Sequence, residues 1–106
     1  MAFPLITLTT DFGPRDGYVA AMKGVILGIC PDASIVDVSH DIEPQDVAQA
    51  ALVLSSAAPY FPAHAIHVAV VDPEVGSYRR PLLLTAMSGR YVGPDNGIFT
   101  HVLAEC

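Results

Sequence analysis

Apolar and polar positions divide the first two thirds of the chain into short apolar runs and longer segments with helical periodicity. The runs lie at Leu5–Thr9, Ser34–Ser39 and Ile66–Val71, and turn-forming residues bound them. Runs of this length with such flanks predict three strands. The first and third runs are apolar almost throughout, which is typical of strands in a parallel sheet that is buried on both faces.

Two helices are predicted between these strands. The first begins after a cap at Asp16 and ends before Pro31. Its apolar residues recur at helical spacing and form one stripe, made of Tyr18, Met22, Val25, Ile26 and Ile29. The second helix covers Val47–Ala58, with Asp46 as a favourable acid at its N-terminus and Pro59 after its end.

The rest of the chain predicts a hairpin and a last helix. Leu82–Ala86 and Tyr91–Gly93 read as two strands around a turn at Ser88 and Gly89, and a helix covers Ile98–Ala104. Alternating strands and helices are the pattern of a three-layer α/β/α fold with a mostly parallel sheet. We therefore expect this chain to form one α/β domain or part of one.

Composition narrows the classes of function. The chain has 106 residues, of which 52% are hydrophobic and 15% charged, so it is not a disordered tail. Its net charge is −6, from 11 acidic and 5 basic residues, and it lacks the basic face that nucleic-acid binding requires. The apolar runs are far shorter than the ~20 residues of a membrane span. We expect a small-molecule ligand, no nucleic-acid partner and no membrane partner.

The cysteines and the N-terminal residues bear on the compartment. Cys30 and Cys106 form no CxxC motif, which predicts neither a disulfide framework nor a zinc site. The first residues carry no basic region and no secretory pattern. These features favour a cytoplasmic location.

Acidic residues follow the predicted strands, at the edge where α/β sheets bind their ligands. Asp11 ends the first strand, and His40 and Asp41 follow the second. Asp72 ends the third strand, and Asp95 follows the hairpin. A divalent-cation site built from Asp11, His40, Asp41 and Asp72 is one interpretation, because hard cations bind carboxylates. The glycine frameworks of dinucleotide and P-loop phosphate sites are absent, as are GxSxG and HExxH motifs.

Each candidate also has a purely structural interpretation. Asp11 and Asp72 stand next to turns, where aspartate commonly bonds the backbone. His40 fits equally well as a histidine whose hydrogen bonds are satisfied within a turn. Asp95 and Asn96 fit the turn that leads into the last helix. The residues alone leave these alternatives open.

Four blocks of residues occur in an order that resembles one enzyme family. The blocks are Thr10–Gly13 with Asp16–Val19 and Met22–Val25; Val36–Ile42; Tyr60–Pro62 with His67–Gly76; and Tyr91–Gly97. Together they cover most of the chain and resemble the S-adenosylmethionine (SAM) hydroxide adenosyltransferases, or SAM hydrolases. The SAM-dependent chlorinase and fluorinase are related to this family. The resemblance implies SAM as the substrate and no cofactor.

The resemblance also implies a reaction, the hydrolysis of SAM to adenosine and methionine by attack of water on the ribose 5′ carbon. The sulfonium leaves as neutral methionine, so the leaving group needs no acid. The remaining task of the site is to hold a water molecule in line and to exclude competing nucleophiles.

Site residues follow from the same resemblance. Asp11 matches the family acid that accepts hydrogen bonds from the two ribose hydroxyls. Asp72 and Arg79, seven positions apart, match two of the three catalytic residues. Asp72 would orient or deprotonate the water, and Arg79 would keep the carboxylate ionised. Asp95 and Asn96 match a block that lies near the nucleoside.

An acid at position 72 favours water over a halide as the nucleophile. The resembling halogenases carry a non-acidic residue there. A carboxylate about 4 Å from a desolvated halide would repel it by about 4 kcal/mol at an effective dielectric constant near 20. A SAM-dependent halogenase is therefore the less favoured enzyme, and a non-catalytic nucleoside-binding or trimer-forming module is an alternative of another class.

The family has a larger architecture than this chain. Its members add a C-terminal β-barrel domain and assemble as homotrimers, and residues 1–106 match only the N-terminal α/β domain. The third catalytic residue of the family, a histidine from a later segment, has no match here. Glu74 replaces a glycine of the family's DPxVG loop. We expect these 106 residues by themselves to be inactive.

Overall fold

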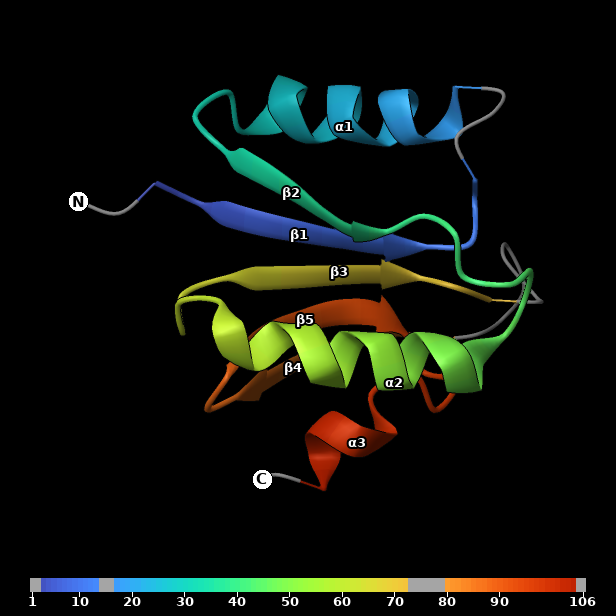
Figure 1. Ribbon diagram of the computed structural model, residues 1–106. Coiled ribbons are helices and arrows are strands. Elements are labelled where there is room, and N and C mark those ends of the chain that lie inside the picture. The colour runs from blue at the N-terminus through green and yellow to red at the C-terminus, as the bar shows by residue number, and fades with distance from the viewer. Residues whose placement is uncertain (1–2, 14–16, 73–79, 105–106) are drawn as a thin grey trace.

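The computed structural model of the protein describes residues 3–13, 17–72 and 80–104. Within these residues a five-stranded sheet has the strand order β2-β1-β3-β5-β4 (Figure 1). The strands are β1 (Leu5–Thr10), β2 (Ser34–Ser39), β3 (Ile66–Val70), β4 (Pro81–Ala86) and β5 (Gly89–Pro94). Every predicted strand is present, and the ends differ from the prediction by at most two residues.

The sheet is parallel except at one edge. β1 pairs in parallel with both β2 and β3, and β3 pairs in parallel with β5. β4 is antiparallel to β5, and their hairpin turns at Met87 and Ser88, because Gly89 already pairs with Ala86. Gly89 has a φ of 147°, and a Cβ there would lie 2.9 Å from the carbonyl oxygen of Ala65, so this position requires glycine.

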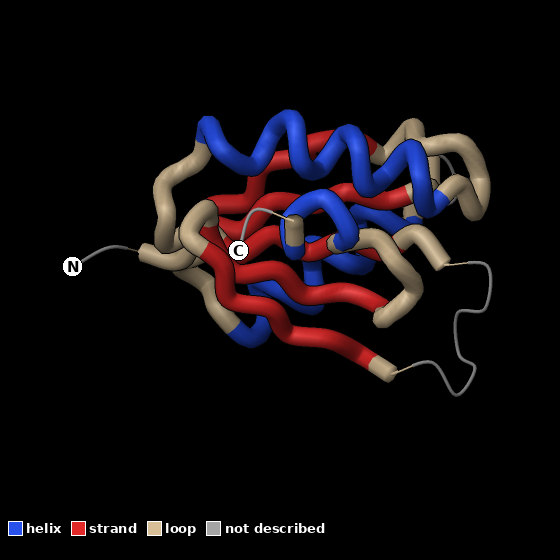
Figure 2. The backbone as a smooth tube through the Cα atoms, turned by 90° about the horizontal axis from the view of Figure 1, so that it is seen from below, coloured by secondary structure: helices blue, strands red, loops and turns tan. Residues whose placement is uncertain are grey.

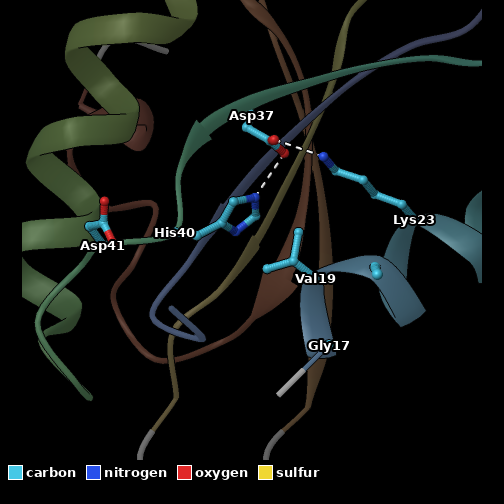
Figure 3. A pocket seen from close by; sticks show the side chains of 7 residues that line it. Gly17, Val19, Lys23, Asp37, His40 and Asp41 are labelled. Carbon is cyan, nitrogen blue, oxygen red and sulfur yellow. Dashed lines mark hydrogen bonds and ion pairs between the residues drawn. The ribbon is translucent and has the colours of Figure 1, made fainter. Parts of the chain in front are cut away.

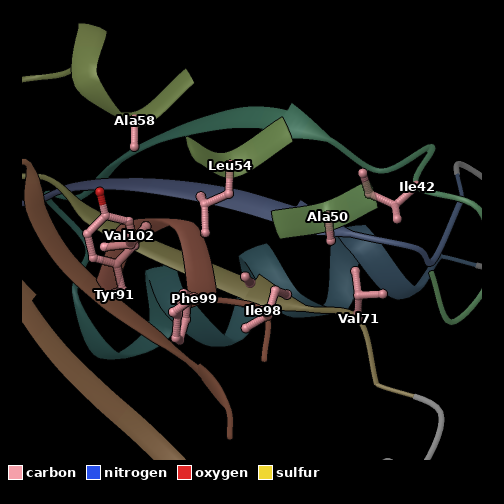
Figure 4. Packing of buried hydrophobic residues seen from close by; sticks show 10 residues of the cluster. Ile42, Ala50, Leu54, Ala58, Val71, Tyr91, Ile98, Phe99 and Val102 are labelled. Carbon is pink, nitrogen blue, oxygen red and sulfur yellow. The ribbon is translucent and has the colours of Figure 1, made fainter. Parts of the chain in front are cut away.

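Helices cover both faces of the sheet. They are α1 (Tyr18–Ile29), α2 (Val47–Ala57) with the 3-10 turn η1 (Ala58–Tyr60) directly after it, and α3 (Thr100–Leu103). The connections β1–α1–β2 and β2–α2–β3 step across the sheet in opposite directions, so right-handed crossovers put α1 and α2 on opposite faces. Figure 2 shows the strands side by side as one layer, and Figure 4 shows α2 in front of the sheet and α1 behind it. The predicted three-layer α/β/α fold is confirmed.

The hydrophobic core lies between the sheet and α2 (Figure 4). Its buried members are Ile42, Ala50, Leu54, Ala58, Ala69, Val71, Tyr91, Ile98, Phe99 and Val102. The last helix begins at Thr100, two residues later than predicted. The reason is that the Asn96 side chain accepts a hydrogen bond from the Ile98 amide at 3.2 Å, which holds this segment in a turn before the helix.

Helix α1 has no buried residue, although its sequence is apolar. Of the predicted apolar stripe, Tyr18, Val25 and Ile29 are 62%, 64% and 81% exposed. The N-cap residue is Gly17, one position after the predicted Asp16, which lies outside the described residues. No helix in the described part of the chain is long and apolar enough to span a bilayer.

Helix α2 begins as predicted. The Asp46 carboxylate caps it by accepting a hydrogen bond from the Gln49 amide at 2.9 Å. The residue before the cap, Gln45, has a φ of 64°, in the left-handed region that non-glycine residues seldom adopt. This turn links the end of β2 to α2 and aims the Gln45 amide back at β1.

Candidate functional site

The structure brings most of the predicted site residues to the carboxyl edge of the sheet. Thr10 pairs with Val70 in the parallel β1–β3 ladder, so Asp11 and Asp72 each follow the end of one of two adjacent strands. Asp95 follows β5, the next strand across the sheet, and Asn96 comes directly after it. The predicted catalytic Arg79 lies outside the described residues, as does Glu74.

The Asp11 carboxylate is fixed by the turn before α2. Its Oδ2 accepts a hydrogen bond from the Gln45 amide at 2.7 Å. The structural alternative for Asp11 was a hydrogen bond to its own backbone, and its carboxylate bonds the Gln45 amide instead. The nearby Phe12 amide donates its hydrogen bond to the Thr10 hydroxyl, at 3.2 Å. Among the described residues the other Asp11 oxygen, Oδ1, has no hydrogen-bond partner. A carboxylate held in this way has acceptor capacity left for a hydroxyl pair.

Asn96 joins the ends of two strands. Its Nδ2 donates a hydrogen bond to the Val71 carbonyl at 2.9 Å, while its Oδ1 accepts from the Ile98 amide. The backbone amide of Asp95 donates to the Arg80 carbonyl at 3.0 Å. These contacts agree with the structural interpretation of Asn96 as a turn residue, and they fix the strand end that carries Asp72.

A polar network joins His40 to Asp37, Lys23 and Thr10, and Figure 3 shows the part that contains Asp37 and Lys23. His40 Nε2 lies 2.8 Å from Asp37 Oδ1, and Lys23 Nζ donates to Asp37 Oδ2 at 2.7 Å. The second ring nitrogen, Nδ1, lies 2.7 Å from the Thr10 hydroxyl. The hydrogen bond from Lys23, followed by that from His40, lowers the pKa of Asp37 below its ordinary value. Both nitrogens of His40 are thus paired, as the structural interpretation of this residue predicts.

Sequence reasoning missed the partners in this network. Lys23 stands on α1 and Asp37 on β2, 14 positions apart, and no motif connects them. The only available signal was that both lie in blocks that carry the family resemblance. Similarly, nothing in the sequence indicated that the Gln45 amide would reach Asp11.

Two cavities lie near these residues. The larger, about 580 Å³, lies between α1 and the end of β2 (Figure 3), and its lining consists of Gly17, Val19, Ala20, Lys23, Asp37, His40 and Asp41. The smaller, about 380 Å³, lies between α2 and α3 and includes Asn96 and Gly97 in its lining. Neither Asp11 nor Asp72 contributes to the lining of these two cavities.

The divalent-cation interpretation gains no support from the geometry. In residues 3–13, 17–72 and 80–104, no three side chains of histidine, cysteine, aspartate or glutamate converge as a metal site would require. His40, which this interpretation needs as a ligand, uses both ring nitrogens in hydrogen bonds to protein groups.

His67 belongs to the core and not to the site. Its Nδ1 lies 2.7 Å from the Thr7 hydroxyl, and its ring stacks on Tyr91 with centroids 4.9 Å apart. Its Nε2 is buried and makes no hydrogen bond among the described residues. Burial lowers the pKa of His67, and this outweighs the opposite effect of the nearby Ser88 backbone. The neutral ring is therefore the form that this core accommodates.

A doubly wound α/β domain with acids along the carboxyl edge of its parallel strands belongs to the class that binds small molecules at that edge. Residues 6–106 match the SAM hydroxide adenosyltransferase N-terminal domain, and the chain belongs to this family.

Two named relatives and one solved structure are similar to this chain. The chain is 54% identical over 103 residues to a protein of Methanocaldococcus jannaschii named (R)-S-adenosyl-L-methionine hydrolase, covering 92% of this chain and 39% of that protein. It is 30% identical to a fluorinase of an Actinoplanes species, covering 96% of this chain and 42% of the fluorinase. A crystal structure of an uncharacterized conserved protein from Thermotoga maritima superimposes with a TM-score of 0.90 at 39% identity, covering 94% of this chain and 39% of that one. The chain thus spans about two fifths of the length of these proteins.

Proposed function

We propose that the protein hydrolyses SAM to adenosine and methionine by attack of water on the ribose 5′ carbon. The observation that carries this proposal is the position of Asp11 and Asp72 after two adjacent parallel strands. A group that binds the ribose and a group that handles the water must act within a few ångströms of the same carbon atom. Identity of 48–54% to four proteins named (R)-S-adenosyl-L-methionine hydrolase supports the same reaction.

In this proposal Asp11 accepts hydrogen bonds from the ribose hydroxyls. The Gln45 amide occupies one lone pair of Oδ2 and fixes the carboxylate before the substrate arrives. Preorganisation of this kind reduces the entropy lost on binding. Asp95 and Asn96 would lie near the nucleoside, with Asn96 acting through the strand ends that it joins.

Asp72 would take the role of the group that orients the water. As the oxygen attacks, a C5′–O bond forms, the C5′–S bond breaks, and its electron pair goes to sulfur, which leaves as the neutral thioether of methionine. The proton lost by the water passes to Asp72 or to solvent. Arg79 would attract the Asp72 carboxylate and hold it in position.

A SAM-dependent halogenase is the second candidate, and its relatives are more distant. The fluorinase match is 30% identical, against 54% for the first hydrolase. The Asp72 carboxylate opposes a halide at the same place for the Coulombic reason given above. We therefore rank hydrolysis first.

The chain would be the N-terminal α/β domain, residues 1–106, of a larger protein. Its matched relatives are about two and a half times as long, and we propose that the remaining length supplies a second domain and completes the site in a homotrimer. SAM would be the small-molecule substrate, without a cofactor, a nucleic-acid partner or a membrane partner. The cytoplasmic location expected from the sequence stays a prediction.

A chromatographic assay tests the proposal. The complete natural protein is incubated separately with the two sulfonium epimers of SAM, since the relatives' names specify the R configuration. Parallel samples contain chloride, fluoride or EDTA. Adenosine and methionine formed from at least one epimer, at a rate that chloride, fluoride and EDTA leave unchanged, support hydrolysis. A 5′-halogenated product would establish the halogenase, loss of turnover in EDTA would establish a metal requirement, and adenosine binding without turnover would establish a binding module.

A further inference from the structure

His40 holds the loop that carries Asp11 at two points. Its Nδ1 lies 2.7 Å from the hydroxyl of Thr10, the residue before Asp11. Its carbonyl oxygen accepts a hydrogen bond from the Gly13 amide at 2.9 Å, two residues after Asp11. We propose that His40 is a positioning residue, which fixes the Asp11 loop for binding of the ribose hydroxyls. This inference rests on the proposed function, in which Asp11 contacts the ribose.

One form of the His40 ring satisfies all of these hydrogen bonds. In this form the Thr10 hydroxyl oxygen accepts a hydrogen bond from the Phe12 amide and donates its own proton to His40 Nδ1. The other nitrogen, Nε2, then carries the proton and donates it to Asp37. A neutral imidazole with its proton on Nε2 satisfies every contact at once.

Shielding from water increases along the network toward Asp11. The side chains of Lys23 and Asp37 are 34% and 40% exposed, whereas that of His40 is 12% exposed. Thr10 is fully buried. Exposed ion pairs contribute little, and shielded hydrogen bonds contribute more. The contact between His40 and Thr10 is therefore the part of the network that determines the position of the Asp11 loop.

A direct catalytic role does not fit the same geometry. Although His40 contributes to the lining of the 580 Å³ cavity, both of its nitrogens are engaged with protein groups. Neither is open to take a proton from a substrate. His40 acts through Thr10 on Asp11, which stands outside that lining.

Two substitutions of His40 separate its two side-chain contacts. In His40→Asn the amide oxygen takes the place of Nδ1 and can still accept from Thr10, but the contact with Asp37 is lost. In His40→Gln the longer side chain reaches Asp37 but offers nothing at the Nδ1 position. Thr10→Val removes the hydroxyl from the other side of the contact at nearly constant volume. His64→Asn is the control, because His64 is exposed in the turn before β3, at the opposite edge of the sheet.

The measurements are the Kd for adenosine by calorimetry and the KM and kcat for SAM, all on the complete natural protein. We expect His40→Gln and Thr10→Val each to raise Kd and KM about 3- to 10-fold, with a smaller change in kcat, because a binding contact is lost. His40→Asn should restore most of the affinity. The double variant Thr10→Val/His40→Gln should be no worse than Thr10→Val alone, because Thr10→Val already removes the contact with His40 together with the hydrogen bond from the Phe12 amide.

The outcomes separate this inference from the proposed function. A wild-type protein that binds adenosine but does not cleave SAM contradicts the proposed reaction, and the Kd values still decide the role of His40. Unchanged Kd and KM in Thr10→Val, or equal losses in the Asn and Gln variants, overturn the positioning role. If the His40 variants do not fold, Thr10→Val decides alone. If adenosine does not bind at all, unchanged hydrogen exchange of the Gly13 amide in Thr10→Val overturns it, because this amide is bonded to His40 and not to the Thr10 hydroxyl.

Discussion

Asn96 donates a hydrogen bond from Nδ2 to the Val71 carbonyl at 2.9 Å, so a residue after β5 holds the backbone directly before Asp72. Val71 is fully buried, and its carbonyl has no access to a replacement water without local opening. The position of the proposed catalytic carboxylate therefore depends on a side chain 24 residues further along the chain.

Removal of this contact should lower both stability and turnover. We expect Asn96→Ala to reduce the free energy of unfolding by about 1–3 kcal/mol, because a buried acceptor is left unpaired. The turnover of SAM should fall more than the affinity for adenosine, since Asp72 moves and Asp11 does not. Urea denaturation and steady-state kinetics measure the two effects, and a stable variant with wild-type kcat would contradict the link to Asp72.

Replacement of Asp72 by asparagine should abolish most of the chemistry and leave binding in place. The amide of Asp72→Asn is nearly isosteric but cannot accept a proton, and loss of a general base typically costs about 10²–10⁴ in rate. The Kd for adenosine should change little. Turnover equal to that of the wild type would refute the role proposed for Asp72.

Replacement of Asp11 should act on the ribose contact. Asp11→Ala should weaken adenosine binding, whereas 2′-deoxyadenosine, which lacks one of the two hydroxyls, should lose less affinity from the same substitution. Calorimetric titration of both nucleosides into wild type and variant measures this difference. Equal losses for the two ligands would show that Asp11 does not contact the 2′ hydroxyl.

His67 should make the fold less stable in mild acid. Its pKa in the folded protein is lowered from the ordinary value of 6.5 by burial. As the pH falls below about 6.5, the unfolded chain therefore binds a proton that the folded core does not accept. The free energy of unfolding should decline from that pH downward and should show no contribution from His67 at higher pH.

The substitution His67→Asn isolates this effect. The amide oxygen of the new asparagine can still accept a hydrogen bond from the Thr7 hydroxyl, but the asparagine side chain does not titrate. Urea denaturation at a series of pH values between about 7 and 5 should give a flatter dependence for the variant than for the wild type. Parallel curves would mean that His67 titrates alike in both states. Asp37, whose pKa is also lowered, contributes in a separate range, below its ordinary value of 3.8.

Sequence patterns predicted the sheet well because short apolar runs between turn residues mark its strands. Ile66–Val71 is apolar almost throughout, and β3 lies within the sheet between β1 and β5, with alternate residues buried. Helix α1 shows the limit of this reasoning. Its apolar stripe suggested a packed face, yet Val25 and Ile29 contact no core in the described chain. Periodicity indicates that a helix forms and not what covers it.

The candidate site was only partly predictable. The strand ends located Asp11 and Asp72, since parallel strands finish at one edge. The contact from Gln45 was not predicted because it is made by a backbone amide. Gln45 reaches Asp11 through a left-handed turn that favours glycine, and the sequence has a glutamine there. A paired His40 was one of the interpretations of the sequence. Its partners Thr10 and Asp37 were not predicted, because their positions depend on how β1 pairs with β2 across the irregularity between Leu8 and Thr9.

The origin of the oxygen in the product tests the central claim most directly. The complete natural protein is incubated with SAM in ¹⁸O-labelled water without halide, and the adenosine is analysed by mass spectrometry. Water attack at the 5′ carbon predicts adenosine with ¹⁸O in its 5′ hydroxyl, at the enrichment of the solvent. Adenosine without the label, or no adenosine at all from either sulfonium epimer, would contradict the account.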